Sequence, residues 1–300
     1  MLHPIRKTAQ GLILLLLMPA IIVAATDSTG AGWKKSLIAD FTATQTAYSD
    51  SWVGGEAGAV SWVGNVNGVA EKQLKPWLDF RSTLRLSFGQ TLTQDTAKEW
   101  SKPRKSTDLI DWENVGRFTL ESYLDPFVAF RLESQFLDAS FEPKKRSFTP
   151  LKLTESAGLT RKFYERETDQ VISRLGFALR QIFKNVIIDT TALSTTDSTL
   201  TDGGIESVTD VTYTLSERLR YTGKLTLYRA FFFSGKDEVA GTAFEDDWKA
   251  IDVNWENIVN ASITRILTVN FYTQFLYDKQ VTRKGRLKQT LGIGFVLKLA

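Results

Sequence analysis

The stretch that decides the fold is Leu287 to Ala300, LKQTLGIGFVLKLA. In an extended strand, successive side chains point to opposite faces. One face of this strand then carries five apolar residues, and the other carries mainly Thr, Gly and Lys: the apolar row is Leu291, Ile293, Phe295, Leu297 and Leu299. A membrane barrel accepts such a row directly, because acyl chains cover the lipid-facing side of each strand. We therefore interpret this stretch as the lipid-facing closing strand of a barrel.

The same alternation runs through most of the chain. Apolar and polar residues alternate from one position to the next over long runs, which is the pattern of a half-buried strand. Membrane-crossing strands need about 9 to 11 residues, whereas strands of soluble proteins average about 5 to 6. The sequence predicts twelve such strands: 36–47, 58–71, 77–93, 108–124, 127–140, 149–162, 171–187, 204–216, 220–233, 248–263, 266–278 and 287–299. Glu155 interrupts the apolar row of the sixth strand, which makes that strand the least regular.

The lengths of the connections carry independent information. Long connections (48–57, 94–107, 141–148, 188–203, 234–247 and 279–286) alternate with mostly short ones. Single-chain outer-membrane barrels alternate long outer loops with short periplasmic turns. The alternation favours an all-β, closed, antiparallel up-and-down transmembrane barrel of about twelve strands, with both ends of the chain on the periplasmic side. A soluble sheet protein with one buried face is the alternative.

The first residues resemble a secretory leader. Arg6 and Lys7 precede an apolar run over 11–23, and small residues surround Ala25. This order of charged, apolar and small segments is typical of a cleaved signal peptide. We predict a signal peptide over 1–25 and a barrel domain over 26–300, located in the outer membrane of a Gram-negative cell.

Residue usage excludes several kinds of site. The chain has no Cys, and its one His is His3, inside the predicted leader. A mature chain without either residue lacks the usual nucleophile pairs and zinc ligands. We expect no catalytic residues, metal or cofactor, no enzymatic activity and no nucleic-acid partner.

Charged residues are concentrated on the predicted inner rows. The lumen-facing charges expected from the alternation are Arg81, Arg85, Asp111, Glu113, Arg117, Glu121, Arg131, Glu133, Arg174, Arg180, Lys224, Asp252 and Glu256. Two interpretations remain open. Either these charges pair and plug the barrel, or they line an aqueous path with mixed charge. The sequence thus predicts passive permeation of small polar solutes, with a closed structural or interaction barrel as the alternative.

Basic clusters lie in the predicted outer loops. They occur at 102–105, 144–146 and 283–288, and Arg and Lys suit the phosphates of outer-leaflet glycolipid. Partners expected for such a barrel are therefore outer-membrane lipid and glycolipid and the outer-membrane insertion machinery, while the oligomeric state stays open. An acidic loop around 237–247 lacks the spacing of a metal-binding loop, which favours a solvated loop.

Three stretches resemble an uncharacterised outer-membrane family, domain of unknown function 3078 (DUF3078). They are TQTAYSDSWVGGEAGAVSWVGNVNGVA near the beginning, a fainter TPLKLTESAGLTRKF in the middle, and the C-terminal AIDVNWENIVNASITRILTVNFYTQFLYDKQV with LKQTLGIGFVLKLA. The resemblance implies export, a barrel and an outer-membrane location. It supplies no catalytic residues, because the family has no established activity. The chain ends in Ala300 rather than in the aromatic residue that such barrels favour.

Overall fold

A computed structural model describes residues 32–46, 57–95, 99–120, 122–141, 143–166, 169–264 and 267–298, with the backbone alone over 295–298. These residues all belong to one compact unit. The predicted signal peptide lies outside the described residues, as do Glu121 and Leu299 and the side chains of Phe295 and Leu297.

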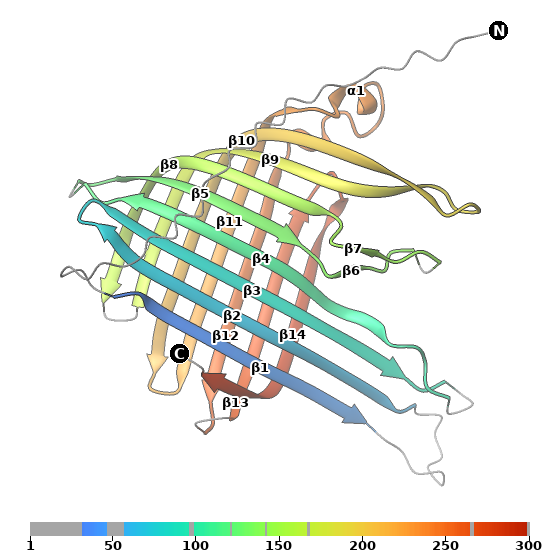
Figure 1. Ribbon diagram of the computed structural model, residues 1–300, viewed down its shortest axis with the longest axis horizontal. Helices are drawn as coiled ribbons and strands as arrows, with labels where there is room; N and C mark the ends of the chain where they lie inside the picture. The colour runs from blue at the N-terminus through green and yellow to red at the C-terminus, as the bar shows by residue number, and fades with distance from the viewer. Residues whose placement is uncertain are drawn as a thin grey trace. The chain divides into compact units, whose positions relative to one another are not determined.

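Twelve long antiparallel strands close into one barrel in the order β1-β14-β13-β12-β11-β10-β9-β8-β5-β4-β3-β2 (Figure 1). Their bounds are β1 Lys34–Thr46, β2 Ala59–Lys75, β3 Leu78–Thr93, β4 Arg104–Phe118, β5 Asp125–Ser134, β8 Leu151–Arg166, β9 Asp169–Asp189, β10 Ser194–Ser216, β11 Leu219–Phe233, β12 Ile251–Ser262, β13 Leu267–Asp278 and β14 Thr282–Lys298. All twelve predicted strands are present, and the prediction of a closed antiparallel barrel is confirmed.

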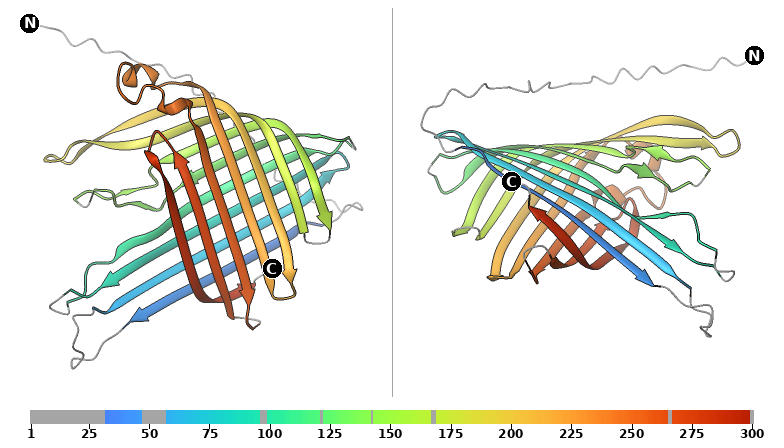
Figure 2. Two further views of the ribbon diagram at one scale, coloured as in Figure 1. Left: turned by 180° about the vertical axis from the view of Figure 1, so that it is seen from behind. Right: turned by 60° about the horizontal axis from the view of Figure 1, so that its bottom comes forward.

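The barrel closes between the first and last strands. Phe41 of β1 pairs with Phe295 of β14, and Thr42 pairs with Gly294. β1 also pairs with β2 along its whole length, from Lys34↔Glu71 to Thr46↔Ala59. The β1–β14 register covers Ile38–Thr42 and Gly294–Lys298, and this closure pairs edges that a hydrocarbon environment would penalise if left open. Figure 2 shows the strands of the two walls running obliquely to each other, as strand tilt in a barrel requires.

Small elements occupy the long connections. β6 Leu137–Asp138 and β7 Arg146–Ser147 form a two-stranded sheet, and α1 Lys236–Val239 and the 3-10 turn η1 Asp247–Lys249 lie between β11 and β12. Among the described residues, no helix has the length and hydropathy needed to cross a bilayer.

The largest difference from the sequence prediction lies between β9 and β10. The polar stretch 188–203 was expected to be a loop, but β9 continues to Asp189 and β10 begins at Ser194. The two strands extend the hairpin past their neighbours (Figure 1), and backbone N–H groups of Thr191 and Ala192 donate to Asp189 at its tip. A stretch rich in Thr and Ser is compatible with a solvated two-stranded ribbon as well as with a loop, so the polarity of 188–203 alone led to a wrong prediction.

Smaller corrections concern other strand ends. β4 ends at Phe118 and β5 begins at Asp125, so the turn there covers 119–124 rather than Asp125 and Pro126. Pro126 instead lies inside β5, opposite Leu159.

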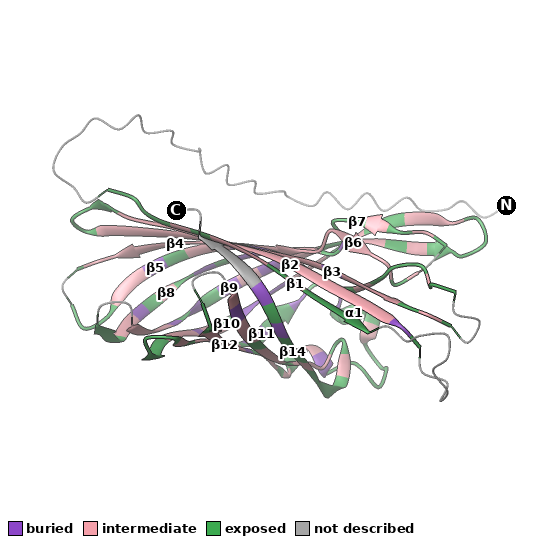
Figure 3. Ribbon diagram, turned by 90° about the horizontal axis from the view of Figure 1, so that it is seen from below, coloured by how far each residue is buried: buried purple, intermediate pink, exposed green. Residues whose placement is uncertain are grey.

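Burial is inverted relative to a soluble protein. Large apolar side chains face outward, with Phe177 70% and Leu291 69% exposed, whereas Asp111 and Arg174 are only 4% and 5% exposed (Figure 3). A soluble protein buries its apolar residues and exposes its charges. An apolar outer face around a polar interior is the arrangement of a transmembrane barrel. Glu155 is the exception noted in the sequence: it is exposed on the outer face, in register with Phe130 and Leu179.

Candidate functional site: the charged interior

The interior is crossed by a direct ion pair between distant strands. The Arg85 guanidinium Nη2 on β3 donates to Glu256 Oε2 on β12 at 2.9 Å. Four strands, β2, β1, β14 and β13, separate β3 from β12 along the shorter way around the barrel. A contact of this length therefore passes through the lumen and not along the wall. Tyr272 and Asn254 also donate to Glu256, each at 3.3 Å.

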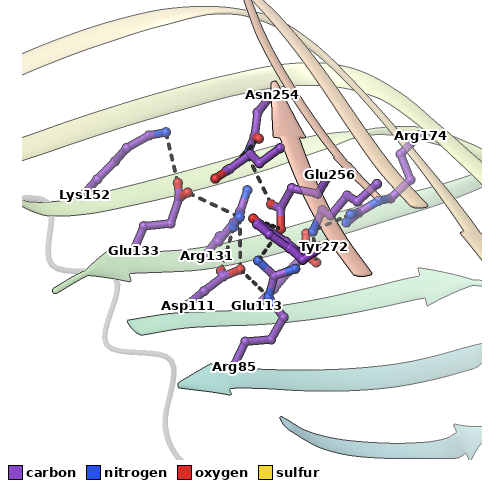
Figure 4. A network of polar contacts seen from close by, with 12 residues as sticks. Arg85, Asp111, Glu113, Arg131, Glu133, Lys152, Arg174, Asn254, Glu256 and Tyr272 are labelled. Atoms are coloured by element: carbon purple, nitrogen blue, oxygen red, sulfur yellow. Dashed lines mark hydrogen bonds and ion pairs between the residues drawn. The ribbon is translucent and has the colours of Figure 1, made fainter. Parts of the chain in front are cut away.

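Asp111 on β4 joins this pair to a second arginine (Figure 4). It accepts two hydrogen bonds from Arg131, at 2.8 and 3.0 Å, and lies 3.3 Å from Arg85. Arg131 in turn contacts Glu133 at 3.2 Å, and Lys152 contacts Glu133 at 2.9 Å. The chain of contacts thus contains three cations and three carboxylates, so its charges balance.

Glu113 holds two cations from the opposite wall. Arg174 on β9 and Lys224 on β11 each reach its carboxylate at 2.7 Å. Four strands, β5, β8, β9 and β10, lie between β4 and β11, so the Lys224 contact also crosses the lumen. Arg174 additionally lies 3.5 Å from Asp210.

A third cluster surrounds Arg180 on β9. Its guanidinium donates to both oxygens of Asp202 at 2.7 and 3.0 Å and to Asp252 at 2.9 Å. The Tyr228 hydroxyl donates to Asp202 at 2.5 Å, and the Arg180 guanidinium lies 3.5 Å from the centre of the Tyr228 ring. This cluster holds its buried arginine by two carboxylates and an aromatic face.

Two of these contacts, Arg85–Glu256 and Glu113–Lys224, span the lumen. We call the seven residues joined through them the crossing network: Arg85, Asp111, Glu113, Arg131, Arg174, Lys224 and Glu256. Isolated charges would be strongly disfavoured in so narrow an interior. Each of these residues instead has at least one partner of opposite charge within 3.5 Å. Breaking a buried pair leaves an uncompensated charge, which makes the network fragile to single substitutions.

Of the other sequence-predicted charges, Glu133 contacts Arg131 of the crossing network, and Arg180 and Asp252 belong to the third cluster. Arg81 and Arg117 have their partners outside the crossing network. Arg117 pairs with Asp79 on the neighbouring strand at 2.7 Å, and Arg81 lies 4.0 Å from Glu71. Glu121 is outside the described residues.

Sequence reasoning missed several members of the interior. Asp202 was assigned to a loop because β10 was expected to begin at Gly204. Lys152 alternates with Leu151 and Leu153, and this alternation was a signal for an inner position. The tyrosines Tyr228 and Tyr272 gave no such signal, because aromatic residues occur on either face of a strand.

A cavity of about 150 Å³ remains beside the third cluster. Its lining comes from eight strands and includes Arg180, Glu206, Thr226, Asp278 and Arg286. Within the described chain, neither Arg286 nor Glu206 has an ion pair, and the buried Thr226 hydroxyl lacks a hydrogen-bond partner. Asp252 is the second residue of β12, next to the long connection from β11, and Asp278 is the last residue of β13, so the cavity is on the long-loop side of the crossing network. It offers both signs of charge to a small molecule or to water.

The basic clusters of the outer loops mostly contact the chain itself. Lys105 lies 3.3 Å from Asp108, Lys144 donates to the Leu193 carbonyl, and Arg146 donates to Asp138 and to the Asn185 carbonyl.

The acidic loop around 237–247 is likewise held by contacts within the chain. Asp247 contacts Lys279 at 3.0 Å and Arg283 at 3.3 Å. Burial raises the pKa of Asp247, but hydrogen bonds and charge from Lys279 and Arg283 outweigh it, so this pKa lies below its ordinary value. No group of metal-ligating side chains occurs among the described residues.

Comparisons with solved structures find barrels of similar architecture. An outer membrane channel from Pseudomonas putida F1 has 13% identity over 91% of this chain and 97% of that chain, with a TM-score of 0.42. The NanC porin has 12% identity over 88% and 100%, with a TM-score of 0.37. The translocator domain of the autotransporter NalP from Neisseria meningitidis has 10% identity over 90% of each chain, with a TM-score of 0.36. At these scores the likeness says nothing about activity. No curated protein matches the sequence.

A family model gives the more specific result. Residues 43–139, which run from the end of β1 through β6, match the family described as protein of unknown function (DUF3078). The match includes the first of the three stretches, with Trp52, Gly54 and Gly55, and stops before the middle and C-terminal ones. The predicted resemblance is thereby found for this part of the chain: residues 43–139 of the twelve-stranded transmembrane barrel are similar to DUF3078.

Proposed function

We propose that this protein is a narrow, selective pathway for small polar solutes across the outer membrane, with the crossing network as its constriction. The observation that carries the proposal is a charged interior bridged at Arg85–Glu256 and at Glu113–Lys224. Charged rings that line a pore select solutes by sign and size. Direct pairs across the lumen would restrict passage further, to solutes small enough to slip past them.

The cavity beside the Arg180 cluster supports this size limit. At about 150 Å³ it is smaller than the roughly 300–1,000 Å³ of drug-sized ligand pockets. Its free Arg286 guanidinium and Glu206 carboxylate suit a solute that carries both a cationic and an anionic group. Such a solute would bind on the long-loop side of the barrel. In barrels of this architecture, that side faces outward from the cell.

A closed structural barrel is the second candidate, and the same contacts favour it. If the crossing network holds permanently, the lumen is shut at its level and the barrel acts through its outer surface. Barrels of eight strands are usually filled and those of sixteen conduct, so strand number alone leaves twelve between the two.

Conductance in a planar lipid bilayer distinguishes the candidates. The refolded mature protein should give small, discrete current steps that scale with salt concentration. The double variant Arg85→Gln/Glu256→Gln removes the crossing pair without changing net charge, and its steps should be larger.

A matched control is Asp79→Asn/Arg117→Gln. It removes an interior pair that joins neighbouring strands and leaves the crossing contacts intact. Its current steps should equal those of the natural protein. Folding is verified by the mobility shift between heated and unheated samples. If neither the natural protein nor either variant then gives current steps, the pathway is rejected and the closed barrel remains.

A further inference from the structure

A groove lies at the long-loop end of the barrel, where β11 outruns its neighbour. The last register pair between β11 and β12 is Arg229↔Ile251, yet β11 continues to Phe233. Beyond that pair, η1 takes the place of a strand against β11. Between them is a hollow of about 350 Å³, lined by Arg229, Ala230, Phe231, Trp248 and Lys249. We call it the rim groove.

Arg229 faces lipid and not the lumen. It is in register with Ile205 of β10 and Ile251 of β12, whose side chains are 36% and 51% exposed on the outer apolar face. Arg229 is itself exposed, and within the described chain it has neither an ion pair nor a hydrogen-bond partner. A charged side chain on a lipid-facing row is disfavoured unless it reaches an anion or water. Its position at the end of the strand pairing lets it reach the headgroup layer.

Lys249 supplies a second cation to the same groove. Its ammonium lies 5.4 Å from the centre of the Trp248 ring and 2.6 Å from the Asp246 carboxylate. Both partners of that ion pair are largely exposed, at 53% and 71%. An exposed pair of this kind contributes little, so a stronger anion can displace Asp246.

The outer face is apolar on both sides of Arg229. Farther from the long-loop end, Leu227 on β11 and Trp255 on β12 are 36% and 49% exposed. Phe231 and Phe177 are 58% and 70% exposed, and their rings meet edge to face at 6.5 Å between centroids. The Trp248 ring packs on Phe233 at the upper edge of the groove. Aromatic residues at this level are typical of the membrane interface, where one end of a ligand is wet and the other is apolar.

We propose that the rim groove binds a phosphate group of an outer-leaflet lipid through Arg229 and Lys249, with the acyl chains lying over Leu227 and Trp255. A guanidinium matches the oxygens of phosphate in geometry and charge. Leu227 and Trp255 lie farther from the long-loop end than Arg229 and Lys249 do, which matches the order of acyl chain below phosphate in such a lipid. This site is distinct from the basic loop clusters, whose members Lys105, Arg146 and Arg283 are already engaged within the chain.

The test uses the folded mature barrel in neutral detergent, with binding measured by native mass spectrometry. The probes are a diphosphorylated glycolipid, the same glycolipid without phosphates, and inorganic phosphate as a competitor. The diphosphorylated lipid should bind, and Arg229→Gln/Lys249→Gln should weaken it about tenfold or more, as expected for the loss of charge-assisted hydrogen bonds. Arg229→Lys should retain most of the affinity.

Lys284→Gln is the matched control, because Lys284 is an exposed cation at the same end but outside the groove. It should bind the lipid as the natural protein does. Equal binding by the Arg229→Gln/Lys249→Gln variant, or equal binding of the dephosphorylated lipid, would overturn the proposal. Full displacement by millimolar inorganic phosphate would also overturn it, because the ligand would then be a soluble anion. The proposal is independent of permeation: the groove variant should keep the natural conductance, whatever that is.

Discussion

The crossing network and the seam wall line the same lumen by different means. We define the seam wall as the inner face of β14, β1 and β2, where the barrel closes. There Asn65 donates to Asp40 at 2.7 Å, Ser87 donates to Asn65 at 2.6 Å, and Ser61 lies 2.8 Å from Thr91. These contacts join neighbouring strands, whereas Arg85–Glu256 and Glu113–Lys224 join opposite walls.

The difference separates two structural tasks. Amides and hydroxyls between neighbours hold strands in register with little desolvation, while paired charges across the lumen draw opposite walls together. A lining of small, mostly uncharged side chains leaves space for water, whereas an ion pair across the lumen occupies that space. We therefore expect any aqueous path to run along the seam wall, with the crossing network on its other side.

The largest effect should follow from removing the carboxylate at the centre of the network. Asp111→Ala leaves Arg85 and Arg131 partly uncompensated in the interior, and should lower the free energy of unfolding by about 3 kcal/mol. On the seam wall, Asn65→Ala should lower it by about 1 kcal/mol, as for an ordinary hydrogen bond. Urea titration of the folded fraction in detergent gels measures both. Equal losses would show that the two walls do not differ in the way described.

A glycine pair tests the same contrast through packing. Gly158 of β8 faces Gly176 of β9, and a Cβ added to Gly176 would lie 2.4 Å from the Ala157 carbonyl oxygen. Gly176→Val should therefore destabilise the barrel by about 2 kcal/mol, since backbone must shift to admit it. On seam strand β2, a Cβ at Gly64 meets nothing within 4 Å, so Gly64→Val should have no measurable effect in the same titration. If Gly176→Val is as stable as the natural protein, then the backbone in this part of the wall can shift to accommodate the side chain.

Most of the fold could be predicted because its signal is local. The period of two in a single strand fixes which side chains share a face, and twelve such strands with alternating connection lengths fix an up-and-down barrel. The same local signal predicted that Arg85 and Glu256 both face the lumen, but it could not predict that they pair with each other. Their pairing depends on the closure and tilt of the whole barrel, which no single strand encodes.

Other features depend on where strands end. One of the two carboxylate partners of Arg180, Asp202, was missed because it belongs to a polar stretch that is equally typical of a loop. The rim groove was missed for a related reason: it exists only because β11 continues for a few residues beyond the start of β12. Strand ends are set by neighbours and by the connections, so sequence alone places them poorly.

A smaller effect should appear in ion selectivity. Glu113→Gln removes the carboxylate that balances Arg174 and Lys224, which leaves excess positive charge on one side of the proposed path. Anion preference, read from reversal potentials in a salt gradient, should rise roughly threefold, or ~0.6 kcal/mol. The seam-wall control Asp40→Asn removes a carboxylate held by a neutral amide. If the proposed path follows the seam wall, this control should shift selectivity in the same direction; no shift from Asp40→Asn would place the path elsewhere.

The smallest effect concerns the connection 234–250 between β11 and β12. The Asp247 carboxylate has a pKa below its ordinary value of 3.8 because Lys279 and Arg283 hold it ionised. A depressed carboxyl pKa stabilises the folded loop above the ordinary value, and this stabilisation is lost as pH falls through the lower, folded-state pKa. The amides over 234–250 should thus stay protected from hydrogen exchange, after correction for intrinsic pH dependence, down to about pH 4 and lose this protection below it.

Asp247→Asn should lose that protection already at neutral pH, whereas Asp246→Asn, which affects only the exposed pair with Lys249, should retain it. Unchanged protection in Asp247→Asn would mean that the loop is held by other contacts, such as the Arg283 donation to the Ala243 carbonyl and the stacking of Arg283 on Phe244.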